Sequence, residues 1–156
     1  SVPHCAEMRP LEPGFAERGT LPPPPATQSP TDKLAYVWND RGTCFREMGD
    51  HTSALKSLLR AVELSPDNPE YLFNLGETLE MIGMMYMSNK YLDSAIQTFK
   101  MVVNQMPNNA SAWNHLGVCF KEMGKADESK FYFDRSRDIT LWKKDTPIKR
   151  KRDEFT

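Results

Sequence analysis

The sequence AYVWNDRGTCFREMG at residues 35–49 returns twice in related form, as PEYLFNLGETLEMIG at 69–83 and as ASAWNHLGVCFKEMG at 110–124. All three stretches have a bulky residue four places before a glycine and an apolar or aromatic residue three places after it. A second glycine follows seven places after the first. Self-similarity on this scale is typical of repeat architectures, in which one small unit is copied along the chain. The sequence therefore predicts a repeat protein.

The equivalent glycines give the length of the repeat. Gly42 and Gly76 are 34 residues apart, whereas Gly76 and Gly117 are 41 apart, which is seven more. The first copy continues with Ala54, Leu58, Ala61 and Pro66, and the second has the counterparts seven residues late, at Ala95, Phe99, Val102 and Pro107. The seven extra residues therefore lie between Gly83 and Ala95. In the third copy Ser129 and Ser136 replace the two alanines, and Leu141 replaces the proline.

Apolar residues in each copy recur at the three- and four-residue spacing of an amphipathic helix. The glycines Gly42, Gly76 and Gly117 then fall inside a helix, where glycine is about 1 kcal/mol less favourable than alanine unless a neighbouring helix must approach closely. Between the copies, Asn68 and Asn109 stand where an N-cap residue precedes a new helix. These features predict an antiparallel helix pair in each copy and stacked pairs that share one core.

This pattern resembles the tetratricopeptide repeat (TPR) family. The resemblance implies an all-α, helix-turn-helix repeat solenoid with an extended proline-rich N-terminal arm. We expect repeats at residues 35–68, 69–109 and 110–141, in a domain that spans 33–141, between an arm at 1–32 and a basic C-terminal tail at 142–156. Eight of the twelve prolines lie in the first 31 residues, and the run at 22–25 favours polyproline II. That run also resembles ligands of polyproline-reading modules.

Composition excludes several classes of partner. The formal net charge of −1 makes a whole-protein electrostatic grip on nucleic acid or an anionic membrane unlikely. Charges interrupt every apolar run before the ~18 residues that a membrane-spanning helix needs. A local basic stretch at residues 149–152, Lys-Arg-Lys-Arg, is nevertheless typical of a nuclear-import signal or an anionic-surface contact.

The three cysteines, Cys5, Cys44 and Cys119, have no zinc-binding spacing and no disulfide framework. Cys44 and Cys119 occupy the same place in their repeats, so we expect buried, inert thiols. This usage favours a reducing intracellular compartment, cytoplasmic or mitochondrial matrix, with the nucleus possible. The chain starts at Ser1 without Met, which fits either removal of an initiator Met or cleavage of a targeting segment.

No catalytic motif is present among the histidines, and no nucleotide-binding glycine motif occurs. We expect no enzyme, no cofactor and no metal site. The resemblance implies a concave surface formed by the first helix of each repeat, and its eighteen positions carry six acidic and two basic residues, a net of −4. Such a surface favours basic or neutral protein segments. Some family members clamp the C-terminal carboxylate of a chaperone. At the positions of the clamp residues this sequence has Asn39, Thr43, Asn74, Ser111 and His115. Only Asn74 is a residue that such a clamp uses, so we expect no chaperone carboxylate clamp.

The seven-residue insertion and its approach contain the methionines Met81, Met84, Met85 and Met87. Seven residues shared by two antiparallel helices lengthen each by close to one turn, so a protruding hairpin is expected. Unbranched thioether side chains suit an adaptable contact with a protein partner. Two alternatives are ordinary packing within the hairpin and Cu(I) binding, although no cysteine or histidine is interleaved with these methionines.

The sequence thus predicts a non-catalytic protein–protein interaction module, a small subunit or assembly factor of a multiprotein complex. The alternative is a nuclear, nucleic-acid-associated factor that uses the basic C-terminal tail. The candidate partner-binding residues are Asn39, Asp40, Glu47, Phe73, Asn74, Glu77, Glu80, Met81, Met84, Met85, Tyr86, Met87, Asn114, His115 and Trp142. Trp142 is included because it follows the last predicted repeat, whose apolar flank has no further helix pair to cover it.

Overall fold

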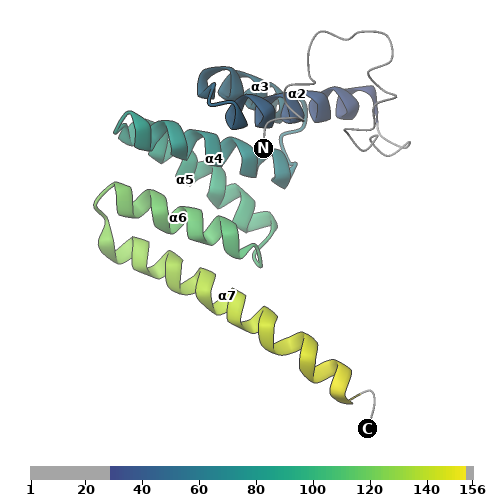
Figure 1. The fold of residues 1–156 in the computed structure, drawn as a ribbon, viewed down its shortest axis with the longest axis vertical. Coiled ribbons are helices and arrows are strands. Elements are labelled where there is room, and N and C mark those ends of the chain that lie inside the picture. The colour runs from purple at the N-terminus through teal and green to yellow at the C-terminus, as the bar shows by residue number, and fades with distance from the viewer. Residues whose placement is uncertain (1–28, 154–156) are drawn as a thin grey trace. The chain divides into compact units, whose positions relative to one another are not determined.

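The computed structural model describes the backbone of residues 29–153 and the side chains of residues 29–144. Within this range the chain forms helices and no strands, in agreement with the predicted all-α fold of helix-turn-helix units. The helices are α2 (Pro30–Glu47), α3 (His51–Leu64), α4 (Pro69–Met85), α5 (Asn89–Gln105), α6 (Ala110–Glu122) and α7 (Ala126–Asp153) (Figure 1). The chain divides into two compact units, Ser1–Thr78 and Leu79–Thr156.

In the first unit, α2 packs along α3 through a close approach at Gly42. A β-carbon at Gly42 would lie 2.5 Å from Cγ of Leu58, whose side chain is fully buried. The predicted reason for a glycine at this place is therefore confirmed. A second buried group joins Ala35 of α2, Ala61 of α3 and Tyr71 of α4.

The helical region begins at Pro30, inside the predicted arm. Ser29 Oγ accepts a hydrogen bond from the backbone N–H of Asp32, and the Asp32 carboxylate accepts one from the backbone N–H of Ser29. This reciprocal capping box satisfies two backbone donors at the start of α2. A proline suits the first helical position because it needs no N–H partner there.

The two predicted asparagine caps are confirmed. Asn68 Oδ1 accepts hydrogen bonds from the backbone N–H groups of Glu70 and Tyr71, at 3.0 and 3.2 Å, at the start of α4. Asn109 Oδ1 accepts one from Ala112 at 3.1 Å at the start of α6. Each cap satisfies backbone donors that the first turn of a helix leaves without a partner.

In the second unit, α5 packs on α6 and α6 packs on α7. A β-carbon at Gly117 of α6 would lie 2.6 Å from Cδ1 of Phe133 in α7, so the close approach predicted there is also confirmed. The two serines that replace family alanines in the third repeat bond across this pair. Ser129 Oγ donates to the carbonyl of Gly117 at 2.9 Å, and Ser136 Oγ donates to that of Ala110 at 2.7 Å.

Three of the four late markers of the second repeat are core residues, and the fourth, Pro107, is exposed. The side chains of Ala95, Phe99 and Val102 on α5 are fully buried. The helices around the insertion are also long. The structure gives α4 four residues more than α6 and α5 three more than α3, so the additional length is shared between both arms of the hairpin.

The three helix hairpins close with the same backbone hydrogen bonds. The N–H groups of Asp50, Ser88 and Lys125 each donate to the carbonyl five residues earlier, at 2.8 to 2.9 Å. The residue before each of these donors has a positive φ, as in a Schellman turn. In the first and third hairpins that residue is Gly49 or Gly124, with φ of 82° and 75°.

The middle hairpin places a methionine at this left-handed position. Met87 has a φ of 50° and is the only non-glycine residue with positive φ among those that the structure describes. Its sequence counterpart in the repeat pattern, Gly83, lies inside α4, because the helix continues past it to Met85. At this positive φ, steric strain destabilises a residue with a β-carbon by roughly 1 kcal/mol relative to glycine.

The last helix, α7, runs to Asp153, well beyond the predicted end of the third repeat at residue 141. The backbone of the basic stretch at 149–152 is therefore helical. The prediction for its side chains, like that for the arm before residue 29, lies outside what the structure describes. No helix found in residues 29–153 has the length and apolar character needed to cross a bilayer.

Candidate protein-interaction surfaces

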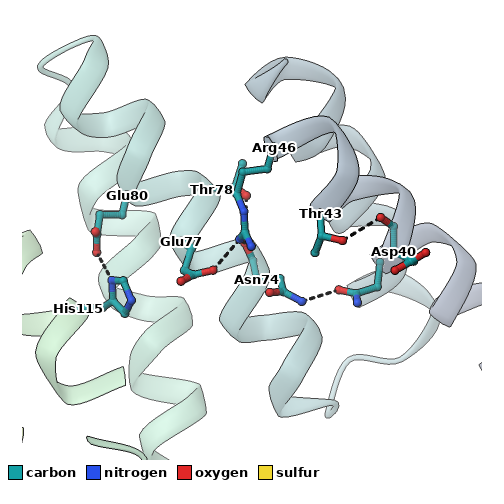
Figure 2. Close-up of polar contacts among 9 residues, drawn as sticks. Asp40, Thr43, Arg46, Asn74, Glu77, Thr78, Glu80 and His115 are labelled. Carbon is teal, nitrogen blue, oxygen red and sulfur yellow. Dashed lines mark hydrogen bonds and ion pairs between the residues drawn. The ribbon is translucent and has the colours of Figure 1, made fainter. Parts of the chain in front are cut away.

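The first unit contains a polar network between α2 and α4, formed by Asn39, Arg46, Asn74, Glu77 and Thr78 (Figure 2). Asn74 Nδ2 donates to Asn39 Oδ1 at 3.0 Å. The backbone carbonyl of Asn74 accepts from Arg46 Nη1 at 3.2 Å and from Thr78 Oγ1 at 3.0 Å. Arg46 Nη1 also lies 2.7 Å from Glu77 Oε2, forming an ion pair. We call these residues the Asn74 network.

The Asn74 network ties α2 to α4 inside the protein. The side chains of Arg46 and Glu77 are only 18% and 27% exposed, and Asn39 is buried. A charge pair with this little solvent around it is less screened than a surface pair. The predicted site residues Asn39, Asn74 and Glu77 thus have internal partners, and their first role is to position the two helices.

The second unit contains a different polar group, which we call the Glu80 network. Glu80 Oε2 lies 3.0 Å from His115 Nδ1 (Figure 2). The same oxygen accepts a weak hydrogen bond from Cys119 Sγ at 3.5 Å. The His115 ring stacks on Phe99, with ring centroids 4.9 Å apart and planes 6° apart. The network therefore fixes the imidazole between a carboxylate and an aromatic face.

The Glu80 network has no nucleophile. Burial raises the pKa of the Cys119 thiol above its ordinary range, and the Glu80 carboxylate raises it further. A thiol attacks only as its thiolate, and here the neutral form is favoured. Cys44 and Cys119 are both buried and form no disulfide, as the sequence predicts for core thiols. Among the residues that the structure describes, no three His, Cys, Asp or Glu side chains come together in a metal-binding group.

The end of the α4–α5 hairpin is the most exposed apolar surface among the predicted site residues. Its four consecutive residues are Met84, Met85, Tyr86 and Met87, which are 44%, 56%, 69% and 91% exposed. Met81, one turn earlier on α4, is also exposed. No charged residue occurs from residue 81 to residue 89, in a chain that is 26% charged. We call residues 84–87 the hairpin tip.

A second apolar surface lies at the end of the last repeat. Trp142 on α7 is 60% exposed and lines an open pocket of about 360 Å³. The other lining residues are Asn108, Arg135, Asp138 and Ile139. Lys143 Nζ donates to the backbone carbonyl of Asn108 beside it. The predicted contact residue Trp142 thus lies at the surface.

The remaining predicted residues are dispersed. Glu47 and Asn114 are exposed, and Asp40 and Phe73 are partly buried. The predicted site residues do not include Arg46, Thr78, Phe99 or Cys119, although each of these four contacts one of them. The sequence did contain a sign that Arg46 pairs with an acidic residue. It is one of only two cations at the expected groove positions, which also include six anions.

Two family models match this chain. A model described as "TPR repeat" matches residues 42–83, and one described as "Tetratricopeptide repeat" matches residues 110–136. Solved structures show the same fold. MamA is 19% identical, with a TM-score of 0.63, over 72% of this chain and 61% of its own. YrrB, described as a TPR protein with an unusual peptide-binding site, is 28% identical, with a TM-score of 0.61, over 67% of this chain and 50% of its own.

Curated relatives point the same way. Photosystem I assembly protein Ycf3 from Prochlorococcus marinus (strain MIT 9211) is 29% identical over 115 residues, which are 69% of this chain and 64% of the relative. The protein of the same name from Parasynechococcus marenigrum (strain WH8102) is 30% identical over 113 residues, covering 68% and 63%. The chain thus spans less than two thirds of the length of these relatives. Its helix pairs, its glycine contacts and both family matches agree, and the chain belongs to the tetratricopeptide repeat family.

Proposed function

We propose that this chain is a non-catalytic interaction module that helps to assemble a multiprotein complex, with photosystem I as the first complex to test. The observation that carries the proposal is the similarity over 115 residues, 69% of this chain, to a photosystem I assembly protein. Stacked helix pairs provide extended surfaces for protein partners and need no reaction centre to act. The nuclear, nucleic-acid-binding alternative gains no support from these relatives.

We propose the hairpin tip as the main docking surface. Its side chains are exposed, uncharged and consecutive, whereas the Asn74 and Glu80 networks bind their polar groups internally. Exposed apolar groups of this kind mark contact sites, and flexible thioethers adapt to an irregular partner. The fitting partner is a folded protein with an apolar, uncharged pocket. Met81 extends this surface along α4, and Trp142 forms a separate contact at the end of the last repeat.

The acidic residues of the expected groove also indicate which charge a partner segment should have. Of the six expected groove anions, Glu77 is paired with Arg46 and Glu80 lies against His115. Over the expected groove positions six anions stand against two cations, and this acidic excess favours basic or neutral partner segments. The buried thiols of Cys44 and Cys119 suit a reducing intracellular compartment.

The test is binding of the purified chain to isolated, detergent-solubilised photosystem I subunits. A variant with Met84, Met85 and Met87 changed to Ser should lose about tenfold or more in affinity, since each buried methionine contributes on the order of 1.5 kcal/mol or more. The matched control changes Met101 and Met106 to Ser, because these are exposed to similar degrees, 47% and 45%, away from the tip. Equal loss in both variants would remove the hairpin tip from the proposal, and no binding by the native chain would remove photosystem I.

A further inference from the structure

The methionines that the structure describes differ widely in how far they are exposed to solvent. Met87 is 91% exposed, whereas the next most exposed methionines in the described residues, Met85 and Met48, are 56% and 55% exposed. Oxidation of a thioether to a sulfoxide requires access of the oxidant to sulfur, so it follows exposure. Among the described methionines, Met87 is therefore the first expected to react.

The backbone around Met87 does not depend on its side chain. The turn is closed by the N–H of Ser88, which donates to the carbonyl of Gly83 at 2.8 Å, and by that of Tyr86, which donates to Ile82 at 3.0 Å. The same turn forms at Gly49 and Gly124, where there is no side chain at all. A chemical change at the Met87 sulfur should therefore leave the hairpin folded.

The thiols of the described residues do not compete for an oxidant. Cys44 and Cys119 are 4% and 0% exposed. Burial also raises the pKa of the Cys119 thiol and so suppresses the thiolate that a peroxide attacks. Among the described residues, the exposed thioethers are left as the accessible reducing groups, and Met87 is the most exposed of them.

We propose that Met87 is a reversible oxidation site through which peroxide controls the hairpin tip. The Met87 sulfur attacks one oxygen of hydrogen peroxide, an S–O bond forms, the O–O bond breaks, and water leaves. The sulfur loses two electrons and the peroxide gains them. The reverse step needs a dithiol-dependent sulfoxide reductase, which returns the thioether and releases water as the dithiol becomes a disulfide.

The consequence rests on the proposed function, in which the hairpin tip docks into an apolar pocket. A sulfoxide is polar and accepts hydrogen bonds, so placing it in an apolar pocket leaves a buried acceptor without a donor. Oxidation should therefore release the partner while the chain stays folded. Met85, the neighbour at the tip, is the second site expected to react.

The experiment uses the full chain in a Cys5→Ser background, so that this cysteine does not consume oxidant. Hydrogen peroxide is added in steps and quenched with catalase, and sulfoxide at each methionine is measured by tandem mass spectrometry. Met87 should react at least about threefold faster than Met81 or Met101, which are 38% and 47% exposed. The thermal midpoint should not change, and the chain should elute earlier from a hydrophobic-interaction column. Met87→Gly should abolish that elution change.

A binding arm separates this inference from the proposed function. Oxidised chain should bind the photosystem I subunits about tenfold more weakly, and sulfoxide reductase with dithiothreitol should restore binding. In Met87→Leu, whatever the affinity before treatment, peroxide should leave the affinity unchanged. Equal oxidation rates at Met87 and Met101, unfolding on oxidation, or unchanged binding by the sulfoxide would each overturn the inference and leave the proposed function standing. If native chain binds no subunit, the proposed function fails, and the oxidation rates and column elution still decide whether Met87 is the site.

Discussion

Gly83 and Leu92 face each other across the α4–α5 hairpin so closely that a β-carbon on residue 83 would lie 2.8 Å from both Cγ and Cδ2 of Leu92. The same β-carbon would lie 3.0 Å from the backbone nitrogen of Leu92. Because Leu92 is buried, its side chain has little room to move away. The absence of a side chain at residue 83 therefore lets α4 and α5 approach closely at this point.

Gly83→Ala should therefore lower the free energy of unfolding by about 1 to 3 kcal/mol, although alanine is intrinsically the better helix former. Chemical denaturation followed by circular dichroism measures the change. A double-mutant cycle supplies the control, since Leu92→Ala makes room for the new methyl group. In the Leu92→Ala background, Gly83→Ala should lower the free energy of unfolding much less. An equal loss in both backgrounds would show that the contact with Leu92 is not the cause.

A second prediction concerns the left-handed turn residue. Met87→Gly should stabilise the chain by roughly 0.5 to 1 kcal/mol, because glycine adopts the positive φ without strain. The reciprocal change, Gly124→Ala, should destabilise it by a similar amount, even though nothing lies within 4 Å of the new β-carbon. Thermal unfolding of the two variants should move in opposite directions. A destabilised Met87→Gly would mean that the Met87 side chain supports the fold.

Much of this fold is predictable from spacing alone. Gly42, Gly117, Asn68 and Asn109 act locally, through one close approach or one cap, and the repeat pattern identifies each of them. The left-handed residue is different. The pattern aligns Gly83 with the turn glycines, but one added helical turn moves the turn itself to Met87. Counting residues between the repeats indicates an insertion, but it does not show which residue adopts the positive φ at the turn.

The polar networks were harder to foresee for another reason. Arg46 and Glu77 are 31 residues apart in sequence. They meet because of how far α2 and α4 are displaced along each other's axes where they pack. Sequence spacing places both on first helices of repeats, yet it contains no information on which charges pair across helices. The prediction of a surface with six anions therefore counted Glu77 as available, whereas the structure gives it a partner 2.7 Å away.

A third prediction follows from that pair. Glu77→Lys should destabilise the chain by about 1 to 3 kcal/mol, because it places two cations together in a partly buried site. The matched control is Glu63→Lys. Glu63 also pairs with an arginine, Arg60, at 2.9 Å, but both side chains are more than half exposed, so its loss should change stability by less than about 0.5 kcal/mol. Similar losses of stability from the two variants would show that the Arg46–Glu77 pair stabilises the fold no more than the exposed Arg60–Glu63 pair does.

A fourth prediction concerns the serines of the third repeat. Ser129→Ala and Ser136→Ala restore the alanines typical of the family but remove the hydrogen bonds to the carbonyls of Gly117 and Ala110. Each should lower the free energy of unfolding by about 1 kcal/mol. Ser94→Ala is the control, since the exposed Ser94 hydroxyl donates to the carbonyl of Lys90 within the same helix, α5. Stabilisation by the family alanine would show that the serine hydroxyls are tolerated rather than used.

The last prediction is a pH dependence set by Cys119. The folded chain holds the thiol proton more tightly than the unfolded chain, because burial raises the pKa of Cys119 above its ordinary value of 9.0. Below that value both states are protonated and the thiol has no effect on the pH dependence. Above it the unfolded chain loses the proton first, so the free energy of unfolding should fall as pH rises, with a slope approaching about 1.4 kcal/mol per pH unit.

Denaturant titrations at successive pH values from about 8 to 10 measure this slope. Cys119→Ala should lose that part of the slope, whereas Leu116→Ala, a change at another fully buried residue of α6, should lower stability by a constant amount at every pH. Tyr36 and Tyr71 also have raised pKa values, from an ordinary 10.0, so their contribution starts at higher pH and is shared by all three proteins. An identical slope in the native chain and in Cys119→Ala would show that the thiol ionises as readily in the folded chain as in the unfolded one.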